Sequence, residues 1–412
     1  MSLGHWFDEI DSVLSAYRDL WQGNPFADPE KFSHQLSPVQ RQTLDDIPFP
    51  LIDQLQSNDE ALLTCLSPVF PAAASLQKAV RRLAPSKISP GPQVSSLSEK
   101  ILVSVPGRKQ AQIRYFADAL GPLHLPVMEW CAGKAHLGRS LHHLHGVPVR
   151  GLEINPELVA QGNALARDKP VTLHCADVMQ AIPVEWLQPE QHAVALHACG
   201  DLHHRFVSIG IAHRMERVSL VPCCYPKSVH PVYQPKSAHA GASALTLSRD
   251  DLKTAIRASA TQSPAENERR KKLQSWRLGF DLLQRKLREK GEYLPLPSLP
   301  TTLLRGSFTH FCEVAAREKN LRLPANTDFQ EYERLGQRRF EEVARLELVR
   351  SLFRRGLELW LVLDLALFLE ENGYDCSLAQ ICPMSLTPRN ILIEARRRGR
   401  ETQDFTSLPS LL

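Results

Sequence analysis

The sequence predicts an α/β fold built on a doubly wound, mostly parallel sheet of seven strands. Between about residues 100 and 226, apolar runs of four to six residues alternate with helical patterns. Such runs are typical of parallel strands that helices cover on both faces. After residue 350, an apolar helix leads to two extended segments with a short connection, which predicts an antiparallel pair at the end of the sheet.

The elements of the predicted core follow one another without long gaps. In chain order we expect a helix at 106–120, a strand at 125–130, a helix at 136–145, a strand at 147–155, a helix at 156–167 and strands at 171–177, 192–201 and 218–225, with one more helix between the last two. This alternation of strands and helices is the sequence signature of a Rossmann-like sheet.

The remaining segments suggest a division into four parts. Residues 1–95 read as a helical N-terminal domain, because apolar residues recur there at three- and four-residue spacing before a Pro- and Ser-rich connection. Residues 100–230 form the predicted core. A helical, basic insertion occupies 231–350, between the fifth and sixth strands. Residues 351–402 supply the last helix and the reversed hairpin.

Bulk composition excludes little beyond non-globular classes. The chain has 412 residues, of which 43% are apolar and 23% charged, and its net charge of +4 is too small to indicate a nucleic-acid partner by itself. Its first residues lack the pattern of a secretory signal, so we expect nine reduced cysteines and a cytoplasmic protein. The apolar run 357–369 contains Glu358 and Asp364, which predicts a buried helix instead of a membrane span.

The turn after the first predicted strand is a candidate ligand-binding loop. A ligand of a doubly wound sheet lies outside the carboxyl ends of the strands, so the turn there must be built from small residues. The segment E-W-C-A-G-K-A (129–135) shares the acid and the middle glycine of the D-x-G-x-G-x-G pattern, with Cys131 and Ala135 in place of two glycines. Taken alone, it fits an ordinary strand–helix turn equally well. The candidate ligand contacts in it are Glu129, Cys131, Ala132, Gly133 and Lys134.

Acidic residues that end the next strands favour a cofactor. Glu153 follows Gly133 by 20 residues and can accept hydrogen bonds from both hydroxyls of a ribose, while Asp177 can meet an adenine amino group. Asn155 and Val178 are the predicted contacts beside them. The loop lacks the G-x-G-x-x-G that pyrophosphate requires, and an acid at position 129 suits a cationic amine. These features favour S-adenosyl-L-methionine over NAD or FAD.

The motifs also resemble a known family. The segments WCAGKAHLGRSL, LEIN, HACGDL, PCCY and TPRNILIEARR resemble the methyltransferase-domain family shared by tRNA acceptor-stem 2′-O-methyltransferases, methyltransferase-like 25 proteins and glutathione S-transferase C-terminal-domain-containing proteins. In that family the loop runs G-x-G-K-G-x-L, so Lys134 and Leu137 match, whereas Cys131 and Ala135 depart from it. GRKQAQI (107–113) is similar to a K-K-x-x-E segment of the family but lacks the acid. The resemblance covers 105–226 and 350–400, and it implies a class I fold and an S-adenosylmethionine-dependent methyltransferase without fixing the acceptor.

Two further groups of residues should converge at the mouth of this site. The candidate catalytic residues are His197, Cys199 and Asp201 after the fourth strand and Cys223 and Tyr225 after the fifth, with Cys224, Arg389 and Asn390 as candidate substrate contacts. His197 is a candidate cofactor contact as well, and it can act as a base at neutral pH or only hydrogen-bond the backbone. Tyr225 can stack on a base or line a wall, Asp201 can cap the next helix, and Arg389 suits a phosphate or carboxylate.

The cysteines leave three interpretations open. The Pro222–Cys223 pair with a second thiol nearby can support carbon methylation of a pyrimidine. Cys199, Cys223, Cys224 and His197 or His203 can bind zinc, although Cys223 and Cys224 point to opposite faces if the chain is extended. Plain lining of a pocket is the third, and we expect no metal.

The acceptor is open as well. Residues 249–290 contain 12 Lys or Arg against 6 Asp or Glu, and RRRGR (396–400) is also basic, so RNA is the expected acceptor. A protein acceptor remains an alternative, with the insertion as its docking surface, and so does a module that binds the cofactor without turnover.

Overall fold

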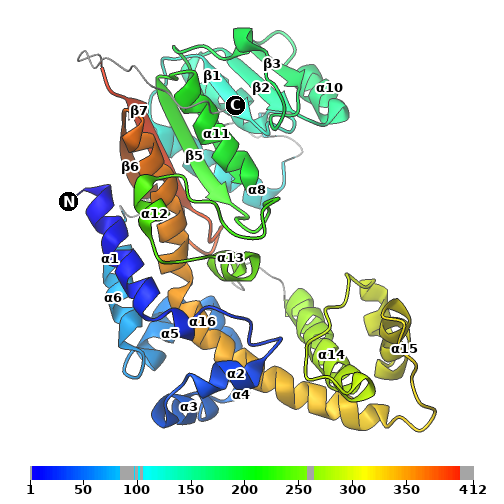
Figure 1. Ribbon diagram of the computed structural model, residues 1–412. Helices are drawn as coiled ribbons and strands as arrows, with labels where there is room; N and C mark the ends of the chain where they lie inside the picture. Colours follow the sequence, from blue (N-terminus) through cyan, green and yellow to red (C-terminus); the bar gives the residue numbers. More distant parts are fainter. Residues whose placement is uncertain (1, 84–96, 98–100, 103–104, 258–263, 400–412) are drawn as a thin grey trace. The chain divides into compact units, whose positions relative to one another are not determined.

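The computed structural model describes residues 2–83, 97, 101–102, 105–257 and 264–399 (Figure 1). The chain divides into two compact units. The first consists of Met1–Asp8, Leu83–Ser243 and Trp360–Leu412, and the second of Glu9–Arg82 and Ala244–Leu359. The predicted connection at 84–97 and the end of the basic tail at residue 400 lie almost wholly outside the described residues.

The first unit contains one seven-stranded sheet, which confirms the predicted class I methyltransferase fold. Its strands lie in the order β3-β2-β1-β4-β5-β7-β6 (Figure 1). The strands are β1 (Val127–Trp130), β2 (Val149–Glu153), β3 (Val171–Cys175), β4 (His192–Cys199), β5 (Arg217–Cys223), β6 (Tyr374–Gln380) and β7 (Ile391–Arg397). The first five are parallel, and β7 pairs antiparallel with both β5 and β6. The carboxyl ends of β1 to β5 therefore meet at one edge, where parallel sheets bind ligands.

Helices and apolar strands build the core of this unit. The helices are α8 (Gly107–Leu120), α9 (His136–His145), α10 (Pro156–Leu165), α11 (Asp201–Ala212) and α12 (Ala238–Ala242), with a short 3₁₀ turn, η2 (Val184–Trp186). α10 and α11 pack against β3 and β4, and one apolar cluster runs from α8 through β1 to β2 and β3. Local sequence fixes the helix ends: Asn155 caps α10 ahead of Pro156, and Gly146 ends α9 in a left-handed conformation.

A single long helix, α16 (Phe329–Glu371), runs into the hairpin of β6 and β7. The sequence predicted helices up to about 350 and a separate apolar helix from 351, because the charge-rich first half of α16 differs in composition from the apolar second half. Within α16, residues 352–367 are buried without a break, as predicted for the apolar run. Among the described residues, no helix is long and apolar enough to span a membrane.

Asp364 anchors the chain after β5 to α16 within the first unit. Its carboxylate is fully buried and accepts hydrogen bonds from Tyr233 Oη (2.7 Å) and from the backbone N–H groups of Lys236 (3.0 Å) and Ser237 (2.7 Å). This explains the charge in the middle of an apolar run: three donors satisfy it.

The change Asp364→Asn should lower the free energy of unfolding by about 2 kcal/mol, because an amide N–H would face donors that need an acceptor. Urea unfolding of the variant and of Asp375→Asn, whose side chain is exposed on β6, measures the difference. Equal loss in the two variants would show that the buried contacts contribute nothing.

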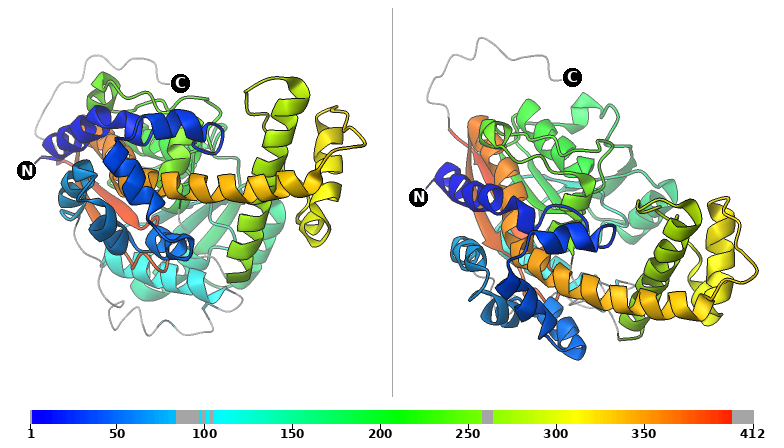
Figure 2. Two further views of the ribbon diagram at one scale, coloured as in Figure 1. Left: turned by 90° about the horizontal axis from the view of Figure 1, so that it is seen from below. Right: turned by 60° about the horizontal axis from the view of Figure 1, so that its bottom comes forward.

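The second unit is helical. It comprises most of α1 (Leu3–Ala16), η1 (Arg18–Leu20), α2 (Pro29–His34), α3 (Pro38–Asp45), α4 (Phe49–Ser57), α5 (Asp59–Leu66), α6 (Pro71–Val80), α13 (Arg249–Ile256), α14 (Pro264–Arg288), η3 (Thr301–Arg305), α15 (Phe308–Glu318) and the first part of α16. Most of the predicted N-terminal domain and most of the insertion thus share one compact unit (Figure 2). Contacts between them include Arg350 Nε to the Trp21 carbonyl (3.1 Å) and Arg345 Nε to the Ile47 carbonyl (3.2 Å). Sequence patterns do not reveal such pairings across 300 residues.

Candidate active site

The loop after β1 uses a left-handed backbone at three alternate positions. Cys131 (φ +54°), Gly133 (φ +59°) and Ala135 (φ +52°) all lie in this region. They occupy the three glycine positions that the sequence pattern suggested. Glycine adopts this conformation without strain, whereas other residues rarely do. Cys131 and Ala135 therefore keep the loop geometry at an energetic cost.

Restoring a glycine should therefore stabilise the loop. Ala135→Gly is expected to raise the free energy of unfolding by about 0.5–1 kcal/mol, offset in part by the loss of a buried methyl group. Urea unfolding checks this, with Ala166→Gly at the end of α10 as the control, because Ala166 has negative φ and a buried side chain. A loss of stability in Ala135→Gly would show that the loop is not strained there.

Glu153, at the end of β2, is held against this loop. Its Oε2 accepts a hydrogen bond from Gly133 N (2.9 Å), and its Oε1 accepts one from Asn155 N (3.1 Å). The carboxylate is half-buried and points to the loop from the neighbouring strand. The structure thus brings together the two residues that the sequence placed 20 positions apart.

Glu129 lies beneath the loop. Its side chain is 4% exposed, and its Oε2 accepts a hydrogen bond from Gly138 N (2.9 Å) in the first turn of α9. Burial raises the pKa of this carboxyl group to about 8, although Gly138 N–H and the charges of Lys109 and Arg139 act in the opposite direction. In this state Glu129 is mostly protonated at neutral pH, and a cation bound beside it would favour its ionised form.

The raised pKa predicts a pH dependence of stability. Between pH 4.5 and 8 the folded chain keeps a proton on Glu129 that the unfolded chain loses, so the stability contributed by this group falls as pH rises through that window. The upper bound is about 5 kcal/mol, at about 1.4 kcal/mol per pKa unit. Urea unfolding from pH 5 to 8 should show a steeper loss for the wild type than for Glu129→Gln. Parallel curves would contradict the prediction.

The other predicted cofactor contacts have local structural roles that the sequence left open. Asn155 Oδ1 accepts hydrogen bonds from Glu157 N (2.9 Å) and Leu158 N (3.3 Å), so it caps α10. Asp177 Oδ1 accepts one from Met179 N (3.0 Å), and Val178 is buried beside it. Ala132 is buried and Lys134 is half-buried in the loop. Their contacts with a cofactor remain predictions.

β4 is irregular where the reacting centre was predicted. The pairing register with β5 shifts between Leu196 and Ala198, and His197 between them has a φ of +64°. Bulges with strained backbone often re-aim a side chain beside an active site. Burial, and then the charge of Arg389, lowers the pKa of His197 to about 4, so the imidazole is neutral at physiological pH. A neutral imidazole can accept a proton, but the lowered pKa makes His197 a weak base at neutral pH.

Three thiols converge beside His197. The Sγ atoms of Cys199, Cys223 and Cys224 all lie within 4.8 Å of one another, and those of Cys199 and Cys223 are 3.3 Å apart. The sequence predicted opposite directions for Cys223 and Cys224, and this was wrong because Cys224 is not extended: its φ is +48°. Hydrogen bonds with Cys199 and Cys223 lower the pKa of Cys224, whereas hydrogen bonds with Cys199 and Cys224, together with burial, raise the pKa of Cys223. Cys223, 4% exposed, is therefore poorly suited to act as a nucleophile.

Asp201 and Asn390 are placed differently from expectation, and Tyr225 takes the wall position that was one of its two alternatives. The cap of α11 is Gly200, and Asp201 is the first helical residue, whose Oδ2 accepts a hydrogen bond from Val229 N (2.8 Å). Tyr225 is 2% exposed and packs edge-on against His203, as a wall residue does. Asn390 is fully buried, and its Nδ2 donates to the Cys382 carbonyl (2.5 Å), so it links the hairpin and does not face an acceptor.

Sequence reasoning missed two cations of the site. The charge of Lys109 affects the pKa of both Glu129 and His197, and that of Lys227 affects Cys224. Lys109 lies in the GRKQAQI segment, and the basic pair Arg108–Lys109 is the sequence feature from which it could have been predicted. Lys227 follows β5 in an unremarkable PKS stretch, and only the turn from Cys224 O to Lys227 N (2.9 Å) brings it back to the site.

Comparisons with known proteins agree with this geometry. Residues 108–229 match a family model described as a methyltransferase domain. These residues form a methyltransferase domain. No curated protein matches the chain. One solved structure that is similar in part is geranyl diphosphate C-methyltransferase from Streptomyces coelicolor A3(2) in complex with Mg2+, geranyl diphosphate and S-adenosyl-L-homocysteine, at 14% identity and a TM-score of 0.25. The match covers 36% of this chain and 62% of that one. The narrower resemblance to tRNA 2′-O-methyltransferases and the two other named groups stays a prediction.

Proposed function

We propose that the methyltransferase domain transfers a methyl group from S-adenosyl-L-methionine to RNA. The observation that carries the choice of donor is the carboxylate of Glu153, fixed by Gly133 N (2.9 Å) at the carboxyl edge of the sheet. A carboxylate in that place accepts hydrogen bonds from ribose hydroxyls. The three left-handed residues of the loop leave its backbone open to a ligand without phosphate. Glu129 beneath the loop suits the cationic amine of the methionine part.

In this proposal the chain's residues mainly position the two reactants. Methyl transfer is an in-line displacement, in which orientation supplies roughly 7–11 kcal/mol. His197, neutral at physiological pH, accepts a proton from the acceptor where the acceptor has one to lose. Arg389, close enough to lower the pKa of His197 and Cys224, offers a positive charge to a phosphate of the acceptor.

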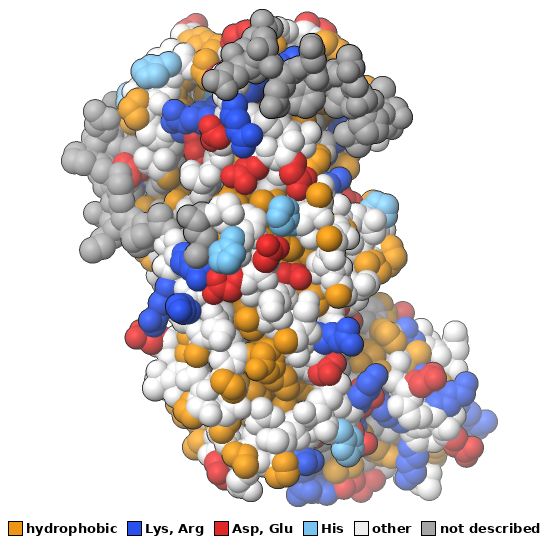
Figure 3. All heavy atoms as spheres, turned by 60° about the vertical axis from the view of Figure 1, so that its left-hand side comes forward, with side chains coloured by type: hydrophobic (Ala, Val, Ile, Leu, Met, Phe, Trp, Pro, Cys, Tyr) orange, Lys and Arg blue, Asp and Glu red, His pale blue; other side chains and the backbone are white. Residues whose placement is uncertain are grey.

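The support for RNA is the excess of cations in residues 249–290. Part of that excess is neutralised, since Lys271 pairs with Asp53 and Glu268 and Arg285 pairs with Asp281. Basic and acidic side chains are also interspersed on the face drawn in Figure 3. In this proposal RNA therefore contacts only those cations of residues 249–290 that acidic side chains do not neutralise.

Transfer of label from S-adenosylmethionine tests donor and acceptor together. The full chain is incubated with labelled donor and either total RNA or a protein extract, and the products are digested with ribonuclease or protease. Label that ribonuclease releases supports the proposal. Label that only protease releases would replace RNA by a protein acceptor. Tight binding of S-adenosylhomocysteine without any labelling would show a cofactor-binding module instead, and no binding would remove the donor as well.

A further inference from the structure

Residues of the second unit line a cationic cavity. It has a volume of about 570 Å³, in the range typical of small-molecule sites. Residues of α13, α14 and α16 and of the segment after α1 line it. Six of its side chains are basic and two are acidic: Lys253, Arg257, Arg270, Arg277, Arg350 and Arg354, against Asp250 and Glu347.

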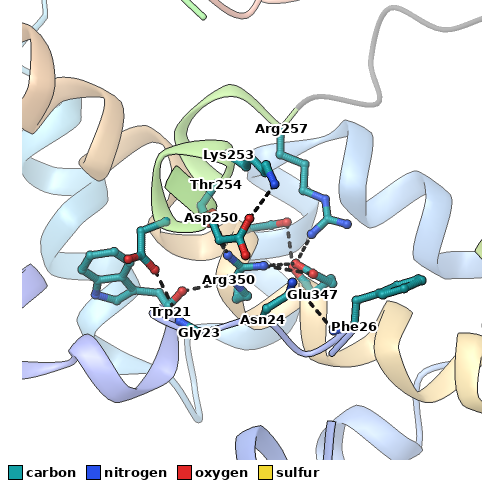
Figure 4. A network of polar contacts seen from close by, with 12 residues as sticks. Trp21, Gly23, Asn24, Phe26, Asp250, Lys253, Thr254, Arg257, Glu347 and Arg350 are labelled. Carbon is teal, nitrogen blue, oxygen red and sulfur yellow. Dashed lines mark hydrogen bonds and ion pairs between the residues drawn. The ribbon is translucent and has the colours of Figure 1, made fainter. Parts of the chain in front are cut away.

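The two acids neutralise only part of this charge (Figure 4). Glu347 is shared by Arg257 and by Arg350, whose Nη1 lies 3.0 Å from Glu347 Oε1. Lys253 pairs with Asp250. Because two guanidinium groups face one buried carboxylate, one positive charge remains in excess at this side of the cavity.

Arg270 and Arg277 add two more charges from α14. Arg270 Nη2 donates to Asn267 Oδ1 (2.7 Å), and Arg277 Nη2 donates to the carbonyls of Leu296 (2.9 Å) and Pro297 (2.5 Å). The Nε of each is buried without a hydrogen-bond partner. Neither forms an ion pair within 4.0 Å among those described for this part of the chain, although the charge of Asp53 acts on Arg270. They are seven positions apart, so they lie on one face of the helix. Both side chains are half-buried, and a half-buried guanidinium group without a carboxylate partner favours an anionic ligand.

The cavity also has an aromatic wall. Phe26 and Tyr293 line it, with their ring centroids 5.8 Å apart in an edge-to-face pair, and Leu273 lies on the same helix face as the two arginines. Arginine forks recognise phosphate, and aromatic rings stack on bases. We propose that this cavity binds a nucleotide, with its phosphate at Arg270 and Arg277 and its base against the aromatic wall. The nucleotide is either free or part of an RNA strand, and the proposal does not depend on the methyl acceptor.

Binding of AMP, inorganic phosphate and a single-stranded RNA 12-mer to the full chain tests this. The double variant Arg270→Gln/Arg277→Gln should bind AMP at least about tenfold more weakly than wild type. Its matched control is Arg305→Gln/Arg317→Gln, which removes two exposed charges of the same unit. Tyr293→Leu should weaken AMP binding but leave phosphate binding unchanged. Thermal unfolding shows whether each variant is folded.

The competition arm separates the two sources of nucleotide. If the RNA 12-mer displaces bound AMP at a lower concentration than unlabelled AMP does, the natural ligand is part of an RNA strand. If unlabelled AMP displaces it at the lower concentration, the natural ligand is a free mononucleotide. Equal AMP affinity in the two double variants, or AMP no tighter than inorganic phosphate, would overturn the proposal. Binding of S-adenosylhomocysteine, measured on the same variants, is expected to be unchanged, so failure here and failure of the proposed function are distinguishable.

The thiol cluster supports an independent inference. Cys199, Cys223 and Cys224 present three sulfur atoms within 4.8 Å of one another, and Zn–S bonds of about 2.3 Å in a tetrahedral site require sulfur atoms roughly 3.8 Å apart. The left-handed Cys224 is what turns the third thiol inward. Lys227 and Arg389 supply positive charge that offsets thiolates. We infer that the cluster binds a thiophilic divalent ion such as zinc, with three protein ligands and a fourth position open.

Metal content tests this inference without any activity assay. Wild type and Cys175→Ser, a change at an exposed thiol of β3, should each retain about one zinc per chain after dialysis, and Cys224→Ser less than about a tenth. Cobalt should give sulfur-to-metal charge-transfer absorption in the first two and not in the third. A folded wild type that retains no zinc and gives no such absorption contradicts the inference, as does unchanged retention by Cys224→Ser.

Discussion

The change Glu153→Gln should weaken binding of S-adenosylhomocysteine by about 100-fold. A carboxylate that accepts two ribose hydroxyls contributes charged hydrogen bonds of roughly 1.5–3 kcal/mol each, and glutamine keeps a single acceptor oxygen. In the structure both carboxylate oxygens are already oriented by Gly133 N and Asn155 N, so the side chain loses little conformational entropy when the ligand binds. The hydrogen-bond energy lost in Glu153→Gln should therefore appear almost entirely as weaker binding.

Calorimetric titration with S-adenosylhomocysteine measures this effect. Glu157→Gln is the matched control, because Glu157 is an exposed acid four positions along the chain in the first turn of α10. Its affinity should stay within about twofold of wild type. An unchanged affinity in Glu153→Gln would remove the ribose contact on which the proposed donor depends.

The sheet could be predicted from sequence because each strand and helix carries its own signal. β1 to β5 are short apolar runs with helices between them, and α9 was predicted with its observed ends, because Gly146 and the small residues before His136 mark them. The order of the strands within the sheet was not predicted and comes from the structure. α16 was predicted as two helices divided at 350, since the change from charged to apolar residues there resembles a boundary.

The site was predicted less completely, for a physical reason. Glu153 and Gly133 meet because equivalent positions at parallel strand ends are neighbours, a rule that sequence alone can use. Backbone strain is not visible in the same way. The positive φ of His197 and Cys224 decides where their side chains point. Neither histidine nor cysteine is a residue type from which a positive φ can be predicted. The burial of Asn390 depends likewise on a hairpin geometry that sequence does not specify.

Gly200→Ala is expected to have the largest effect on folding. A Cβ atom at this position would lie 1.5 Å from the carbonyl oxygen of Lys227 and 2.4 Å from its carbonyl carbon. Asp201 N donates to that same oxygen (3.1 Å), and Val229 N donates to Asp201, so the segment after β5 is tied to the start of α11. The added methyl group can be accommodated only if this segment moves. We expect a loss of more than about 4 kcal/mol, or insoluble protein.

Steric overlap and backbone strain can be separated by a second glycine. Gly121 has a similar φ of +64°, but a Cβ atom there meets no heavy atom within 4 Å, so Gly121→Ala should cost only about 1 kcal/mol. Urea unfolding of both variants gives the difference, which measures the close approach of Lys227. Because the displaced segment carries Cys224 and Lys227, any folded fraction of Gly200→Ala should also lose the site at the end of β5. If Gly200→Ala were no less stable than Gly121→Ala, the segment after β5 would not be fixed against α11.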